Sequence, residues 1–257
     1  MEILYFIVAA FSTIIGSSVG LGGGVIIKPV LETLSDYSLP TVNLLSSSTI
    51  FVMSIVTVVY QLKKKDKINL KNTIVVALGS MVGGVIGQKI MNFMAKKGIN
   101  MEIVSNIQNI ILIVILIIVF IYMKNKDNIK NYNINNILLI GFLGIFLGSI
   151  SAFLGIGGGP LNVAAFTILF SMSTNEAARN SIIVIFFSQG SKILSVALTT
   201  GFSSYKLEML PLMMAGGVIG GIVGYRINKS VSEKNIIKIF DTVLISIVLL
   251  NVYNIFK

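Results

Sequence analysis

The chain of 257 residues contains no cysteine and no histidine. Their absence excludes disulfides, thiolate nucleophiles, Cys/His metal sites and imidazole acid–base chemistry, and with them an intramembrane Ser–His protease or a zinc protease. Carboxylates are also scarce, and they form no close pair for two-carboxylate catalysis. They are Glu2, Glu32, Asp36, Asp66, Glu102, Asp127, Glu176, Glu208, Glu233 and Asp241. We therefore expect no enzyme, no catalytic residue, no metal site and no cofactor.

Charged residues make up only 12% of the chain, and the mean hydropathy is +0.90. Several apolar runs reach the roughly 20 residues that a helix needs to cross a bilayer. This composition predicts an all-α, multi-pass membrane protein with no separate soluble domain. The stretch from Met1 to Ala10 lacks a basic start and a small-residue cleavage pattern, so we expect it to form part of the first span and to stay attached.

A glycine-rich phrase occurs twice, 135 residues apart, as Gly20-Leu21-Gly22-Gly23-Gly24 and Gly155-Ile156-Gly157-Gly158-Gly159. Adjacent glycines do not continue a stable helix, and hydrocarbon tolerates a broken backbone only where protein or a water-filled cavity satisfies its N–H and C=O groups. Each phrase follows a helix-length apolar run and precedes a shorter one. The phrases therefore predict two broken helix pairs that border a buried cavity.

The similarity extends beyond these glycines, because Ser46 falls on Ser181 at the same offset and Gly83–Gly87 matches Gly220–Gly224 at an offset two residues longer. We interpret the chain as a duplication. The expected organisation is a first transmembrane repeat over 1–123, a polar linker over 124–135 and a second repeat over 136–257. The expected helices are 3–19, 24–35, 41–60, 70–94 and 102–123 in the first half, and 136–154, 160–171, 175–199, 206–227 and 234–256 in the second.

The direction of the repeats depends on whether each glycine break turns the chain back or only bends it. If it turns back, thirteen basic residues lie on one side and five on the other, whereas a bend gives ten against eight, with Lys28 and Lys192 inside the membrane in both cases. Because basic loops favour the cytoplasmic side, this bias favours a hairpin and inverted repeats. The thirteen are Lys63, Lys64, Lys65, Lys67, Lys71, Lys124, Lys126, Lys130, Arg179, Arg226, Lys229, Lys234 and Lys238, and the five are Lys89, Lys96, Lys97, Lys206 and Lys257.

The short helices after the phrases present their N-termini to the breaks, and such ends suit an anion. Pro160 fits the first turn of the second short helix, where its missing N–H is harmless. Two converging termini would form a cradle of backbone amides for an anion. The alternative is that the glycines only permit close helix packing. We prefer packing for two further stripes, Gly79, Gly83, Gly84 and Gly87 in the first half, and Gly216, Gly217, Gly220, Gly221 and Gly224 in the second.

These features resemble the TauE/SafE sulfite-exporter family over nearly the whole chain. The matching residues are Gly20, Gly22, Gly23, Gly24, Pro29 and Ser46–Thr49 in the first half, and Gly155, Gly157, Gly158, Gly159, Asn180 and Ser181 in the second, with Gly201 before the last glycine-striped helix. The halves differ in that Pro160 directly follows the second phrase and Ala164 stands where Pro29 would fall. The resemblance implies transport of small anions, especially sulfur oxyanions and organosulfonates such as sulfite or sulfoacetate, across the cytoplasmic membrane.

Polar side chains inside the spans complete the candidate site. Lys28 could contact substrate or pair with Glu32, Arg179 could contact substrate or extend to the interface, and Lys192 lies deep in its span, one turn after Gln189. Hydroxyl and amide groups could bind anion oxygens or only join helices. The candidate substrate-binding set is Gly22, Gly23, Gly24, Lys28, Ser46, Ser47, Gly157, Gly158, Gly159, Arg179, Asn180, Ser181, Gln189 and Lys192.

The resulting hypothesis is a secondary transporter of small anions in the cell membrane that works by alternating access. A channel-like anion pore and a non-transporting membrane scaffold remain as alternatives. The expected partners are a small anionic substrate, the lipid bilayer and, as an open alternative, further copies of the chain in a homo-oligomer. Nucleic acid is not among them, because the net charge of +10 comes from lysines in short loops.

Overall fold

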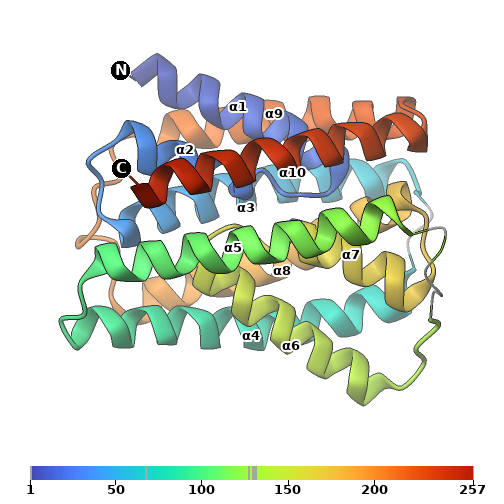
Figure 1. The fold of residues 1–257 in the computed structure, drawn as a ribbon, viewed down its shortest axis with the longest axis horizontal. Helices are drawn as coiled ribbons and strands as arrows, with labels where there is room; N and C mark the ends of the chain where they lie inside the picture. The colour runs from blue at the N-terminus through green and yellow to red at the C-terminus, as the bar shows by residue number, and fades with distance from the viewer. Residues whose placement is uncertain (1, 67–68, 127, 129–131, 257) are drawn as a thin grey trace.

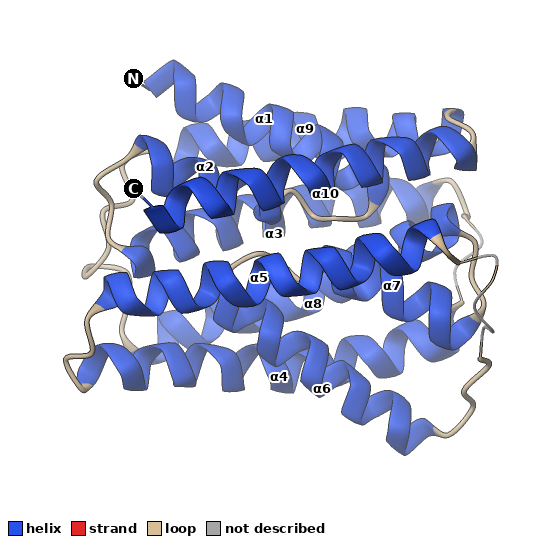
Figure 2. Ribbon diagram, viewed as in Figure 1, coloured by secondary structure: helices blue, strands red, loops and turns tan. Residues whose placement is uncertain are grey.

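A computed structural model describes residues 2–66, 69–126, 128 and 132–256, and these residues form ten α-helices without a β-strand (Figures 1 and 2). Eight of the helices are long and apolar enough to cross a membrane, so the predicted all-α, multi-pass fold is confirmed. The helices are α1 (Glu2–Val19), α2 (Gly24–Leu34), α3 (Leu39–Lys63), α4 (Leu70–Lys96), α5 (Met101–Lys124), α6 (Ile137–Leu154), α7 (Gly159–Phe170), α8 (Thr174–Thr199), α9 (Leu210–Ser230) and α10 (Glu233–Phe256).

Helix starts follow local sequence signals. Asn100 and Asn136 accept hydrogen bonds from the first backbone N–H groups of α5 and α6, and Ser173 forms a capping box with Glu176 at the start of α8. The largest difference from the sequence prediction is α9, which begins at Leu210, not near residue 206, because residues 202–209 are bends, turns and irregular backbone before the proline in its first turn. Of the predicted linker 124–135, residues 127 and 129–131 lie outside the described residues.

The two halves exchange packing partners. α1 of the first half packs most extensively against α9 of the second, and α6 of the second packs in the same way against α4 of the first. α3 packs against its counterpart α8, and α5 against its counterpart α10 (Figure 1). Because the most extensive contacts between elements recur with the halves exchanged, the packing follows the duplication seen in the sequence.

Glycine stripes form these exchanged contacts, in keeping with the close packing predicted for them. A Cβ atom on Gly216 of α9 would lie 2.8 Å from the backbone N of Ala10 in α1, and one on Gly87 of α4 would lie 2.8 Å from the backbone N of Phe153 in α6. Neither distance leaves room for a side chain. Small residues that let helix backbones approach are a common basis of packing in membranes, where the hydrophobic effect does not drive helices together.

Both glycine-broken pairs turn back toward the end of the bundle from which they start. In Figure 1, α1 begins and α2 ends at the left end, whereas α6 begins and α7 ends at the right end. We call the left end the α2–α3 end, after the connection between those helices, and the right end the α3–α4 end. The first pair therefore enters the bundle from the α2–α3 end, and the second pair enters from the α3–α4 end.

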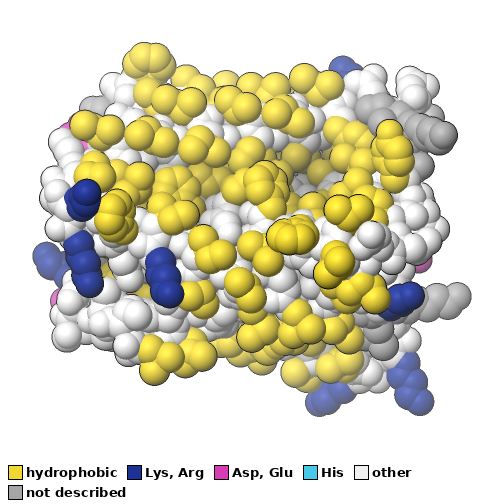
Figure 3. Space-filling view, turned by 90° about the horizontal axis from the view of Figure 1, so that it is seen from below, with side chains coloured by type: hydrophobic (Ala, Val, Ile, Leu, Met, Phe, Trp, Pro, Cys, Tyr) yellow, Lys and Arg dark blue, Asp and Glu magenta, His cyan; other side chains and the backbone are white. Residues whose placement is uncertain are grey.

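The surface between the two ends is largely apolar, and Figure 3 shows one such face with lysine and arginine gathered toward its edges. Large apolar side chains such as Ile118 on α5, Leu138 on α6 and Leu198 on α8 are more than half exposed. Contiguous exposed apolar surface of this extent is expected where lipid, not water, surrounds the helices.

Candidate functional site

The glycine phrases form two left-handed breaks of nearly equal geometry. The backbone φ is +79°, +81° and +81° at Gly20, Gly22 and Gly23, and +71°, +79° and +75° at Gly155, Gly157 and Gly158. Glycine adopts this conformation without steric cost, whereas L side chains rarely do. α2 and α7 then begin at Gly24 and Gly159, and neither has a side-chain cap on its first N–H groups. The predicted helix breaks are confirmed.

The two breaks meet at the centre of the bundle. A Cβ atom on Gly24 would lie 2.6 Å from the carbonyl oxygen of Ile156 in the other phrase, and one on Gly159 would collide with the backbone of Leu21. Two buried isoleucines, Ile50 on α3 and Ile185 on α8, lie against Gly22 and Gly157. They are themselves 135 residues apart in the sequence. Apolar side chains therefore occupy space beside both phrases in this conformation.

Side chains of α8 hydrogen-bond to the first phrase and pack against it. The Ser181 hydroxyl on α8 donates a hydrogen bond of 2.8 Å to the carbonyl oxygen of Gly20. The methyl group of Ala178, one turn earlier on α8, lies against the same glycine, where an added Cβ would be 2.7 Å away. A hydroxyl and a methyl group thus close this side of the first break.

The second phrase has polar neighbours without protein partners. Asn43 on α3 lies against Gly155, at the position corresponding to Ala178, and both polar atoms of its side chain are buried without a hydrogen bond. The Ser46 hydroxyl, which corresponds to that of Ser181, and both polar atoms of Asn162 on α7 are likewise buried and unpartnered among the described residues. Because buried polar groups in folded proteins are nearly always hydrogen-bonded, these five atoms provide unused capacity to bind a polar ligand.

Two lysines are buried near the same centre. Lys28 on α2 donates a hydrogen bond of 2.7 Å to Gln108 on α5. Its ammonium lies 3.6 Å from the Glu32 carboxylate, so the ion pair that the sequence analysis gave as one alternative for Lys28 is present. Lys192 on α8 donates a hydrogen bond of 2.8 Å to Ser47 on α3. It belongs to none of the ion pairs among the described residues, and the Lys28 charge lies within electrostatic range of it. Two lysine side chains and the Glu32 carboxylate therefore lie close to the broken helix pairs.

The remaining candidates lie on α8. Gln189, one turn before Lys192, is buried with its side-chain oxygen unpartnered. The Asn180 side chain joins helices, because it accepts a hydrogen bond of 2.6 Å from Thr73 on α4 and donates one to the Glu176 carbonyl oxygen. Arg179 is partly exposed and contacts Asn228 on α9, whose amide donates to the carbonyl oxygen of Ser18 at the end of α1.

Three residues beside the candidate site were not singled out in the sequence. Asn43 and Asn162 are the unpartnered amides of the second phrase, and Gln108 holds the Lys28 ammonium while donating a hydrogen bond of 2.7 Å to the Phe153 carbonyl oxygen. One signal was available for Asn43. The 135-residue offset places it on an alanine, so the duplication itself shows that the two breaks have unequal surroundings.

The fold and this centre define a class of multi-pass membrane protein in which two homologous halves bring glycine-broken helix pairs together among buried polar and charged side chains. The family model described as sulfite exporter TauE/SafE matches residues 5–251. The chain therefore belongs to the sulfite exporter TauE/SafE family.

Two curated relatives are similar to the chain over most of their length. The probable membrane transporter protein YunE of Bacillus subtilis (strain 168) is 28% identical over 91% of this chain and 90% of the relative. The probable membrane transporter protein MJ0441 of Methanocaldococcus jannaschii is 27% identical over 94% of this chain and 91% of the relative. No solved structure matches significantly. The family and these relatives support membrane transport.

Proposed function

We propose that the protein is a secondary transporter of small anions, of the sulfur oxyanion or organosulfonate type, that works by alternating access in the cell membrane. The observation that carries the proposal is the group of buried, unpartnered polar atoms of Asn43 and Asn162, which lie against the second phrase, and of Ser46, one turn after Asn43 on α3. The family and the names of the relatives support transport as the general activity.

The chemistry of the centre favours an oxyanion. The Asn43 and Asn162 amides and the Ser46 hydroxyl can donate hydrogen bonds, and the N-terminus of α7 adds backbone N–H groups and the positive end of the helix dipole. Lys28 and Lys192 contribute positive charge nearby. Several neutral donors with partly neutralised cations bind an anion tightly enough to capture it and weakly enough to release it, as transport requires.

The transport cycle that we propose uses inverted repeats. It is supported by the entry of the two broken pairs from opposite ends of the bundle (Figure 1). The concentration of lysines around the connections at the α3–α4 end supports a cytoplasmic location for that end. Of the thirteen basic residues predicted for the cytoplasmic side, Lys67 and Lys130 lie outside the described residues. Of the five predicted for the opposite side, Lys257 does so. Rocking of the halves would move Ile50 and Ile185 off the phrases and expose the second break to each side in turn.

The test is flux through proteoliposomes that contain the purified full chain, with radiolabelled sulfite, thiosulfate or sulfoacetate outside and unlabelled anion inside. We expect saturable uptake that unlabelled anion on the opposite side accelerates, and a reduced rate in Lys192→Met liposomes. Protein-free liposomes are the control. Flux without saturation or exchange would support a channel-like pore, and the lack of both flux and binding would support a scaffold.

A further inference from the structure

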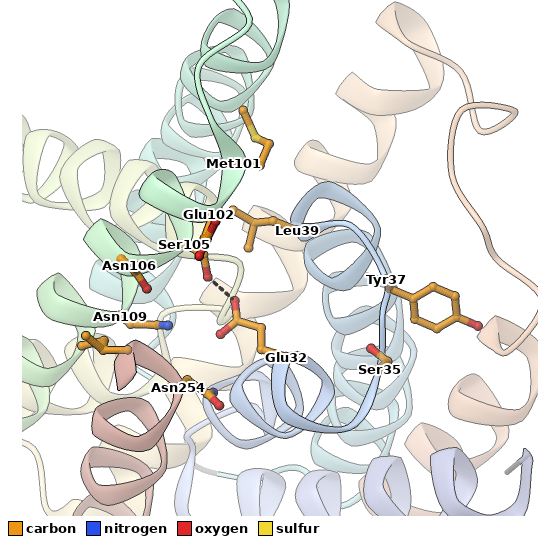
Figure 4. A pocket seen from close by; sticks show the side chains of 11 residues that line it. Glu32, Ser35, Tyr37, Leu39, Met101, Glu102, Ser105, Asn106, Asn109 and Asn254 are labelled. Atoms are coloured by element: carbon orange, nitrogen blue, oxygen red, sulfur yellow. Dashed lines mark hydrogen bonds between the residues drawn. The ribbon is translucent and has the colours of Figure 1, made fainter. Parts of the chain in front are cut away.

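A polar cavity of about 340 Å³ lies at the α2–α3 end, between the end of α2, the start of α5 and the end of α10 (Figure 4). Its lining includes Glu32 from α2, Glu102, Ser105 and Asn109 from α5, Tyr37 from the α2–α3 connection, and Asn254 from α10. The anion site proposed above does not use this cavity. Glu32 connects the cavity with the proposed anion site, because it lines the cavity and also pairs with the buried Lys28.

The Glu32 carboxylate is only half satisfied. Its Oε1 accepts a hydrogen bond of 3.1 Å from Ser105 and lies 3.6 Å from the Lys28 ammonium, whereas its Oε2 is buried and has no partner among the described residues. The side chain as a whole is 10% exposed. The side-chain oxygen of Asn109, which lines the same cavity, is also buried and unpartnered. Two unsatisfied acceptors at one cavity indicate a missing donor or positive charge.

We propose that Glu32 is the coupling site of the transporter, where a proton enters from the cavity and binds as the anion binds. The proposal rests on the proposed function and deepens it by naming the coupling ion. The proton adds to Oε2 of Glu32 and forms an O–H bond, and the Lys28 ammonium then loses its carboxylate partner. The bound anion takes the place of that carboxylate as the counter-charge for Lys28.

The coupling follows from the cost of unbalanced charge in a low-dielectric interior. Protonation of Glu32 alone removes the counterion of Lys28, and an anion that binds while Glu32 is ionised is repelled by that carboxylate. Both events together conserve the charge of the interior. Each ligand therefore strengthens the binding of the other by the same factor.

Few other titratable groups face Glu32. Lys28 faces it from its own helix, Glu102 from α5 and Tyr37 from the α2–α3 connection, while α3 and α10 contribute Leu39 and Asn254, which do not ionise. On α1, which also packs against α2, Tyr5 lies beside Tyr37, and on α8 Lys192 lies within electrostatic range of Lys28. Burial, with smaller contributions from Tyr5 and Glu208, raises the pKa of Tyr37 above the usual tyrosine value. Tyr37 therefore stays neutral between pH 5.5 and 8. Glu2, which is exposed at the start of α1 and does not line this cavity, serves as the control carboxylate.

The experiment measures anion affinity from thermal stabilisation of the purified full chain at pH 5.5 and pH 8, with thiosulfate, sulfate and methanesulfonate as probes because their charge is constant over this range. We expect wild type to bind at least one probe about fivefold or more tightly at pH 5.5 than at pH 8. Glu32→Gln should lose this pH dependence and keep the higher affinity at both values. Glu2→Gln should behave as wild type.

Wild-type protein also gives a test that does not depend on the folding of a variant. In weakly buffered solution with a pH indicator, addition of a bound probe should take up about one proton per anion. Affinity that is independent of pH, or no proton uptake, would overturn the coupling while leaving anion transport intact. A requirement for Na⁺ in place of the pH dependence would also overturn it. The failure of every probe to bind at either pH would instead contradict the proposed function.

Discussion

The two glycine breaks have the same backbone shape but different chemistry around them. At the first break, Ala178 and Ser181 close the backbone with a methyl group and a hydrogen bond. At the second, Asn43 and Ser46 occupy the corresponding positions and leave their polar atoms unpartnered. Both copies of the duplicated unit thus keep the helix break. Their different side chains make the first break a structural feature and the second a candidate binding site. The comparison separates residues needed for the fold from residues needed for the anion.

The largest effect is expected where the two phrases touch. Gly159→Ala places a methyl group inside the Leu21 backbone, which cannot move away as a flexible side chain could, so we expect a loss of about 3 kcal/mol or more of stability. Measurement of the melting temperature and of the monodisperse yield checks this. Gly98→Ala is the control, because nothing lies within 4 Å of its Cβ position and only backbone strain of about 1 kcal/mol remains. Equal behaviour of the two variants would show that the breaks do not meet as described.

Asn43→Ala should lower anion affinity by about 10- to 100-fold, because a hydrogen bond to a charged ligand contributes about 1.5–3 kcal/mol. The melting temperature of the anion-free protein should not fall, since the amide has no protein partner to lose. Asn180→Ala is the matched control, because its amide bonds Thr73 and should affect stability while leaving affinity unchanged. A variant of Asn43 that loses stability but binds normally would reassign this residue to packing.

Ser46→Ala and Ser181→Ala compare equivalent hydroxyls directly. We expect Ser46→Ala to lower anion affinity about fivefold without loss of stability. Ser181→Ala should lower stability by about 1 kcal/mol without loss of affinity, because it removes the hydrogen bond to Gly20. Ligand titration and thermal unfolding on the same samples distinguish the two results. The opposite assignment would mean that the first break is the binding site.

The smallest expected effect is a difference between Gly22→Ala and Gly157→Ala. Both substitutions carry the strain of a positive φ, but the new methyl group would lie 2.9 Å from Ile185 Cδ1 at Gly22, and no closer than 3.4 Å to a neighbour at Gly157. We expect Gly22→Ala to be the less stable by roughly 0.5 kcal/mol, a fraction of the usual overpacking cost. Melting curves in the same detergent check the order, and the reverse order would count against the placement of Ile185.

The sequence predicted the helices well because apolar run length and contiguous glycines are local signals. Helix α9 was less well placed at its start, since its preceding turns contain apolar residues such as Leu207 and Met209 that resemble a span. The exchange of α1 and α6 between halves could not be predicted, because the glycine stripes show that close packing occurs and not which helix is the partner.

The candidate site was predictable where a residue type is unusual in a membrane. Lys28 and Lys192 stand out as charges within apolar helices, and the structure buries both. An asparagine such as Asn162 does not stand out, because the same residue also joins helices, as Asn180 does. Whether its amide has a partner depends on neighbours from other helices, and only the three-dimensional arrangement supplies them.

The exchanged packing of α1 on α9 and of α6 on α4 has a consequence for biogenesis. As the chain leaves the ribosome, the first helix enters the membrane long before its principal neighbour has been synthesised. It must remain in lipid, or be held by insertion factors, until the ninth helix arrives. Neither half can form its most extensive helix contacts alone, so the two halves must assemble together to reach the native fold.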